Sequence, residues 1–318
     1  MTMLPTFKHF ELTRLADGVY AAIEMQGGAA YSNAGIIDLG DQTLIFDTFD
    51  APQAAQDLKA AAEHLTGHPA TCIVNSHWHG DHWSGNQVFA RAAIIATHKT
   101  LEEMRPLAKQ IEAMRHDPSD LEDTIRQNQE RLESETDERW RAYLESSTIR
   151  LRYTLDTLPI LAVCLPNVTF DARLVFHGTR RTAELLTWGV GHTSSDCSLV
   201  LPEEQIAFAG DLGFFQCQPF MPSCEPQAWA AQLEKMEQSD IETFVPGHGP
   251  VGTKADIALQ RQYIIMLEET VAQAIKAGQS IQEFIRQPLP APFDAWLSRG
   301  IARFEANVKF LYQRLSDK

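Results

Sequence analysis

The sequence has no long hydrophobic segment, and this excludes a helical membrane anchor. Nowhere in its 318 residues do about 18 apolar residues run together, as a membrane-spanning helix requires. The first residues, MTMLPTFKHFELTRLADGVY, also have no apolar core of the kind that a signal peptide carries. We therefore expect a cytoplasmic protein that does not bind a membrane.

Basic side chains are too few for a protein that binds nucleic acid. The chain has 27 Lys and Arg residues against 42 Asp and Glu residues, which gives a formal net charge of -15. A field of this sign repels phosphate backbones unless a local basic patch overcomes it, and only short pairs such as Arg180-Arg181 occur. We expect a small-molecule substrate and no nucleic-acid partner.

Cysteine is scarce and scattered, which argues against a disulfide framework. The five cysteines are odd in number and include no CxxC pair. Cys217 and Cys224 are close enough in sequence to form a redox pair. We expect packed or shielded thiols instead.

The residues that are present predict a layered α/β protein. In the first third, short apolar runs typical of strands (residues 43–47, 71–75 and 94–96) alternate with an Ala-rich helix over 52–65. From Arg173 onward, β-rich runs return and predict an antiparallel meander over residues 173–178, 183–191, 197–202 and 206–211. A helix over 226–238, a strand over 241–245, and helices over 254–277 and 299–315 complete the prediction.

A polar, helix-forming stretch interrupts this pattern between residues 100 and 160. It is rich in Glu, Arg and Gln, and Ser119 to Glu122 has the spacing of a capping box directly after Pro118. Two helices, arranged as a hairpin, follow from this reading. Because few apolar positions recur, we expect an insertion laid on the main domain. It could cap an active site, make a dimer contact or be a solvated excursion.

The strongest chemical signal is the run His77-Trp78-His79-Gly80-Asp81-His82. Imidazole nitrogens and carboxylate oxygens are good ligands for zinc and similar metals. The run follows the predicted strand 71–75, so it lies in a loop at a strand end, where α/β folds place reactive groups. His77 and His79 can converge on one metal, while Asp81 and His82 point to a neighbouring position.

Further ligands are expected in loops at other strand ends, because one loop cannot fill two coordination spheres. His192, Asp211 and His248 each stand beside glycine after an apolar run. Any one of them alone would more often be structural. Together, and in this order, they indicate a metal site.

The segments HWHGDH, GHTSSD, AGDLGF and PGHGP, in that order, resemble the metallo-β-lactamase superfamily. The resemblance implies that one metal is held by His77, His79 and His192, that the other is held by Asp81, His82 and His248, and that Asp211 bridges both. It also matches Asp47 to an early family motif, as a partner that orients a metal-bound histidine. The cofactors implied are two divalent ions, with zinc expected and iron or manganese as alternatives.

The same resemblance implies a sandwich of two mixed β-sheets flanked by helices, an αββα arrangement. We expect one domain over residues 1–318, with the helical insertion at 100–160 and C-terminal helices at 254–318 packing on the core. The resemblance to the family also leads us to expect a homodimer.

A site of this kind predicts hydrolysis. Two metals about 3.5 to 4 Å apart can share a hydroxide nucleophile, and Asp81 can orient it or shuttle its proton. We expect a small carbonyl substrate, such as a thioester, a lactone or a related ester or amide. The alternatives are a phosphodiesterase or nuclease, weak β-lactamase activity, and a binding protein that has kept the fold without catalysis.

The expected metal ligands of this chain differ from those of three other branches of the superfamily, which argues against the reactions of those branches. Flavodiiron reductases tend to have Glu where this chain has His79, and persulfide dioxygenases use one iron with fewer ligands. Several zinc β-lactamases have Cys at the position of Asp211.

The walls of the substrate pocket are less clear from sequence. The Gly-rich segment 26–33 is either a mobile flap, whose Tyr31 reaches the substrate carbonyl, or a hairpin turn with a surface tyrosine. Aromatic residues next to the predicted ligands could form an apolar wall or simply pack in the core. These residues are Trp78, Trp83, Trp188, Phe214 and Phe215.

Overall fold

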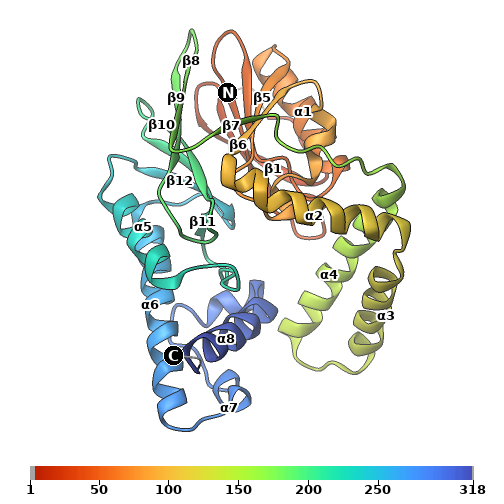
Figure 1. Ribbon diagram of the computed structural model, residues 1–318, viewed down its shortest axis with the longest axis vertical. Helices are drawn as coiled ribbons and strands as arrows, with labels where there is room; N and C mark the ends of the chain where they lie inside the picture. The colour runs from red at the N-terminus through yellow and green to blue at the C-terminus, as the bar shows by residue number, and fades with distance from the viewer. Residues whose placement is uncertain (1–3, 317–318) are drawn as a thin grey trace.

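The computed structural model describes residues 4–316, and within this range the strands form two sheets that pack face to face (Figure 1). The predicted domain covers residues 1–318, and the predicted C-terminal region covers residues 254–318. Residues 1–3 and 317–318 of these predictions lie outside the described residues. Helices flank both sheets. The predicted αββα fold class is therefore confirmed.

The first sheet has seven strands in sequence order within residues 4–316. They are β1 (Phe10–Ala16), β2 (Val19–Glu24), β3 (Ala34–Asp38), β4 (Thr43–Phe46), β5 (Ala70–Val74), β6 (Ala93–Thr97) and β7 (Val168–Phe170). Pairing is antiparallel from β1 to β4 and parallel from β4 to β7. The parallel strands end at one edge of the sheet, and this is the edge that carries the site.

The second sheet contains the predicted meander. In the described chain its order is β12 (Thr243–His248), β11 (Ile206–Phe214), β10 (Cys197–Leu201), β9 (Thr182–Thr187) and β8 (Arg173–His177). Strands β8 to β11 are antiparallel, as predicted, and β12 adds parallel to β11. The last strand lies later than the predicted 241–245, because its pairing with β11 continues to His248.

Alternation along the strands explains why both faces of each sheet are covered. Ile37 and Phe46 pack between the sheets with Phe208 of β11, whereas Ile36 and Ile45 point to the opposite face. Successive side chains of a strand point to opposite faces, so a strand that is apolar at every position must be covered on both sides.

Helices supply that cover. Helix α1 (Pro52–Thr66) packs on the outer face of the first sheet through its alanines and Leu58. The outer face of the second sheet is covered by α5 (Pro226–Gln238), α6 (Lys254–Lys276) and α8 (Ile301–Ser316), with the short helix α7 (Ile281–Ile285) between the last two. Cys217 and Cys224 are buried in the same core and form no disulfide with each other.

The polar stretch between β6 and β7 forms three helices, and the expectation of two was wrong. They are α2 (His98–His116), α3 (Ser119–Ser134) and α4 (Glu138–Thr157), and Figure 1 shows α3 and α4 as a hairpin. The missed boundary lies at Asp137, whose side chain accepts a hydrogen bond from the Arg139 amide and caps α4.

The predicted capping box at Ser119 is also wrong. The Ser119 amide donates to the side chain of Asp117, so it is not free for Glu122. The first carbonyl of the helix is that of Pro118, which makes Ser119 the first helical residue. The stretch has a small core of its own, formed by Leu121, Ile125, Leu158 and Leu161.

No helix between residues 4 and 316 is long and apolar enough to cross a membrane.

Candidate metal centre

The structure brings all seven predicted ligands together in two adjoining groups. One group consists of His77, His79, His192 and Asp211, and the other of Asp81, His82 and His248. Within each group the ligand atoms lie within 4.8 Å of one another. We call these side chains the seven-residue cluster. The division between the groups is the one that the sequence resemblance implies.

The first sheet contributes four of these side chains from a single loop. Strand β5 ends at Val74, and the chain then runs through His77 and His79 into a short 3-10 helix, Gly80–His82. The His82 amide donates to the carbonyl of His79, and this tight turn brings His82 back over the end of β4. One loop can thereby serve both groups.

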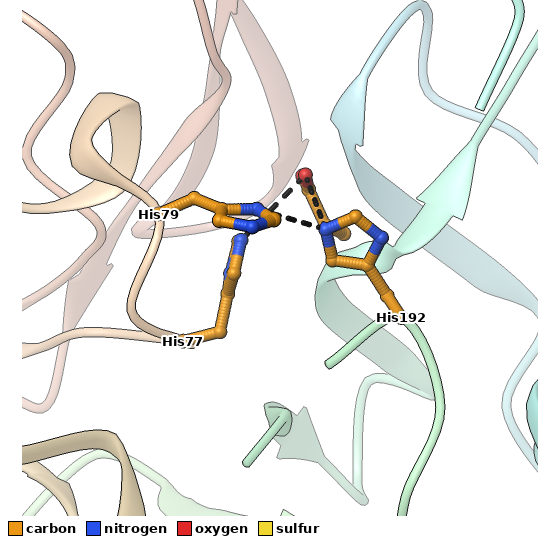
Figure 2. Close-up of side chains that lie close together, drawn as sticks. His77, His79 and His192 are labelled. Carbon is orange, nitrogen blue, oxygen red and sulfur yellow. Dashed lines mark hydrogen bonds and ion pairs between the residues drawn. The ribbon is translucent and has the colours of Figure 1, made fainter. Parts of the chain in front are cut away.

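The second sheet contributes the other three. His192 lies in the loop between β9 and β10, and His248 is the last residue of β12. Asp211 lies inside β11, not in a loop as predicted, because the pairing with β12 shifts register around it and then resumes. Figure 2 shows His77, His79 and His192 turned toward one another from the two sheets.

Two glycines make room for the Asp211 carboxylate. Gly210 has a φ of 56°, in the left-handed region, and turns the strand locally at the register shift. At Gly247 an added Cβ would lie 1.9 Å from Asp211 Oδ1. Any side chain there would displace the carboxylate.

The carboxylate of Asp211 stands between the two groups. Its Oδ2 is 3.3 Å from His192 Nε2 and 3.6 Å from His77 Nε2. Its Oδ1 is 3.0 Å from His82 Nε2 and 3.6 Å from His248 Nε2. One oxygen therefore faces each group, which is the arrangement that a bridging ligand needs.

The buried polar atoms of the cluster fit a metal site. His77 Nε2, His82 Nε2 and Asp211 Oδ1 are buried and make no hydrogen bond within the described part of the chain. Buried polar atoms without a partner are rare, because the loss of hydration is not compensated. A cation at each group would satisfy them, and imidazole with carboxylate is a typical ligand set for zinc, iron or manganese.

Protonation in the cluster also suits cation binding. Burial, the largest influence, lowers the pKa of His77 and of His192, so both imidazoles are neutral. Burial alone would raise the pKa of Asp211, but the neighbouring His82, His248 and His77 hold it well below the usual value. Burial would likewise lower the pKa of His82, yet Asp211, Asp47 and Asp81 raise it well above 6.5. A metal must displace that proton, so metal affinity should rise with pH.

Asp47 orients His82 directly and His77 through Ser76. Its Oδ2 lies 2.7 Å from His82 Nδ1, and both its oxygens accept from Ser76, at 2.7 and 2.8 Å. The Ser76 hydroxyl in turn lies 2.9 Å from His77 Nδ1. Asp47 has a φ of 62°, which is uncommon for a residue with a side chain and persists only where the surroundings fix it.

A cavity of about 390 Å³ opens beside His248. Its lining includes Tyr31, Phe220, Arg150 of α4 and Arg303 of α8. The Tyr31 ring lies 5.9 Å from the His248 ring, centroid to centroid, so Tyr31 is part of the cavity wall and not a surface residue.

The segment that carries Tyr31 is tied to the loop after β12. It connects β2 to β3, and Asn33 Nδ2 donates to the carbonyls of Pro246 and Gly249, at 2.9 and 2.8 Å. The Ser32 hydroxyl donates to the Asp81 carbonyl at 2.5 Å. These bonds fix Tyr31 relative to the cluster.

Of the two alternatives for the aromatic residues next to the ligands, packing against the core is the one found. Trp83, Phe214 and Phe215 are buried in the hydrophobic core, where ring burial is most favourable. Trp188 packs against the core, and Trp78 stacks edge-on with His79 at 4.3 Å. The cavity lining includes Tyr31, Tyr143 and Phe220. The sequence did not single out Phe220.

Sequence reasoning also missed Ser76, Ser223, Arg150 and Arg303. Ser223 has its hydroxyl 3.1 Å from His79 Nε2. Ser76 directly precedes the histidine run and could have been noticed there. The two arginines stand in ordinary amphipathic helices, and no local pattern marks them.

Comparisons with known proteins agree with this geometry. A sequence model of the metallo-beta-lactamase superfamily matches residues 27–248. Among solved structures, a metallo-beta-lactamase from Pontibacter korlensis aligns with a TM-score of 0.56 at 16% identity, over 80% of this chain and 98% of its own. VMB-1 aligns with 0.57 at 16% identity, over 82% and 99%, and the DIM-1 metallo-beta-lactamase with 0.57 at 14% identity, over 81% and 98%.

Likenesses at these identities establish the fold alone. The family match is more specific, because it covers most of the chain and includes every residue of the seven-residue cluster. The chain belongs to the metallo-β-lactamase superfamily and has the side chains of a metal-dependent hydrolase.

Proposed function

We propose that the protein is a dinuclear hydrolase that acts on a small carbonyl substrate, a thioester, a lactone or a related ester or amide. The observation that carries the proposal is the position of the Asp211 carboxylate, with one oxygen toward each ligand group. A side chain in that position would hold two cations close together, and zinc is the ion proposed for both.

When bound, the two ions would lower the pKa of a shared water and polarise the scissile bond. Asp81 has its Oδ2 3.3 Å from His248 Nε2 and 3.6 Å from His82 Nε2, at the edge of the second group. Neighbouring His82 and His248 outweigh burial and hold the pKa of Asp81 below its usual value, so it is a carboxylate that can orient a nucleophile and accept its proton.

Tyr31 would assist from the cavity side. Its ring stands against His248, and Tyr31 belongs to the lining of the cavity into which a substrate must fit. A phenol there can donate a hydrogen bond to a carbonyl oxygen as negative charge develops on it. The cavity volume of about 390 Å³ suits a small molecule.

The test is a substrate panel with metal-loaded protein: thioesters, lactones, esters and lactams against bis-p-nitrophenyl phosphate and RNA. We expect carbonyl substrates to be hydrolysed with kcat/KM at least about tenfold above the phosphodiester, and lactams to be poor substrates. Preference for RNA with a steep salt dependence would instead indicate a nuclease. Tight metal binding with no hydrolysis of any compound would indicate a binding protein.

A further inference from the structure

Two arginines from helices far apart in sequence meet at the cavity. Arg150 of α4 and Arg303 of α8 both line it, and contacts between α4 and α8 join these helices (Figure 1). Both contact the Tyr31 ring, with Arg150 Cζ 4.1 Å and Arg303 Cζ 5.8 Å from its centroid. Both guanidinium groups are half-buried.

These guanidinium groups are only partly satisfied by the protein. Arg150 donates from Nε to Asp50 Oδ2 at 3.0 Å, and its two terminal nitrogens have no hydrogen-bond partner among the residues described. Arg303 donates from Nη1 to the Gln218 carbonyl at 3.4 Å, hydrogen-bonds the Tyr31 side chain, and pairs with no carboxylate of the described chain. Glu24 also lines the cavity, so two arginines and one glutamate face the space.

Guanidinium donors without a partner beside a cavity are notable in a chain whose net charge is -15. Half-buried guanidinium groups have lost part of their hydration, and the fork of N–H donors matches a carboxylate in geometry. A bound anion would accept the hydrogen bonds that these N–H donors have lost with water.

The position of Arg303 connects this charge to the cluster. Its Cζ lies 5.5 Å from the Phe214 ring, which stacks on the His248 ring at 4.9 Å and 17°. Arg303 and His248 also line the same cavity, so an anion held by Arg303 would share that cavity with a residue of the second ligand group.

We propose that Arg150 and Arg303 form a carboxylate-recognition site, and that the preferred substrates bear a carboxylate a few carbon atoms from the scissile carbonyl. The proposal rests on the proposed function for the reaction, and it adds the class of acyl group. The Tyr31 ring contacts both guanidinium groups, and Asp50 fixes that of Arg150.

The kinetic test compares mono-4-nitrophenyl adipate with 4-nitrophenyl hexanoate, which have acyl chains of equal length and differ in the terminal carboxylate. We expect the wild type to prefer the adipate ester by at least about tenfold in kcat/KM. Arg303→Gln and Arg150→Gln should each lower that preference by about tenfold, the usual effect of one charge-assisted hydrogen bond. Hydrolysis of the hexanoate ester should change by less than about threefold.

Matched controls remove one positive charge from the same helices outside the cavity. Arg152→Gln on α4 and Lys309→Gln on α8 change exposed residues, and we expect both to keep the preference. Metal content per chain and the melting temperature are measured for every variant. Should Arg303→Gln fail to fold, Arg303→Lys keeps the charge without the fork, and part of the preference should remain.

Binding to the metal-loaded protein separates this proposal from the proposed function. By calorimetry, adipate should bind at least about tenfold tighter than hexanoate, and Arg303→Gln should remove the difference. That result supports the carboxylate site even if no ester is hydrolysed. Ester hydrolysis with equal affinity for adipate and hexanoate, or equal losses on both esters in the arginine variants, would overturn it.

Discussion

The seven-residue cluster and the cavity beside it are built in different ways. The cluster comes from β11, from the end of β12 and from loops that follow strands of the two sheets, and five of its side chains are buried. The cavity wall comes from the β2–β3 connection, α4 and α8, whose arginines stand in half-exposed positions. The rigid sheets thus set the chemistry, while the helices and the connection set what can enter.

This difference predicts two kinds of variant. Changes in the cluster should alter metal content and reduce the hydrolysis of every substrate together. Changes in the cavity wall should leave the metals in place and alter the choice of substrate.

The largest effect is expected for Asp211→Asn. An amide offers one oxygen, so it cannot face both ligand groups as the carboxylate does. We expect metal content to fall to one ion or fewer per chain, and kcat to fall by about a thousandfold or more, since metal activation of the nucleophile supplies several kcal/mol. Elemental analysis and kinetics measure both. Asp240→Asn, an exposed change just before β12, is the control, and full metal content in Asp211→Asn would count against a bridging role.

A smaller effect is expected for Asp47→Asn. The change weakens the hydrogen bond that fixes His82 and places an amide where Ser76 needs an acceptor. Metal affinity should fall by about 10- to 100-fold, as is usual for groups that orient a ligand. Competition with a chromogenic chelator measures it, with the exposed Asp41→Asn as control. Unchanged affinity would show that the strand ends alone position the histidines.

The smallest effect is expected for Tyr31→Phe. The ring keeps its contacts with Arg150 and His248, and only the hydroxyl is lost. We expect kcat to fall by about tenfold on all carbonyl substrates, with metal content unchanged, because one hydrogen bond to the developing charge is removed. If kcat is unaffected while KM rises, Tyr31 contributes to binding and not to the chemical step.

The same contrast explains what could be predicted from the sequence. Alternating apolar runs predicted the sheets, and the spacing of His77 to His82 predicted a metal loop, because strand ends place neighbouring residues in fixed relation. Asp211 was predicted between the two groups, where its carboxylate lies, but in the wrong element, since a register shift inside β11 leaves no mark in the local sequence.

The cavity wall could not be predicted in this way. Arg150 and Arg303 are 153 positions apart, and their approach depends on how α4 packs against α8. The sequence left the aromatic residues next to the ligands either at the cavity or in the core, and the core offers them more buried area. Tertiary packing, not local pattern, decides both outcomes.

Titration of metal-free protein with zinc, with hydrolysis and bound metal measured at each addition, tests the central claim most directly. The account predicts that binding saturates at two ions per chain and that hydrolysis reaches its maximum only with the second ion. Saturation below one ion per chain, or full hydrolysis in the absence of metal, would contradict it.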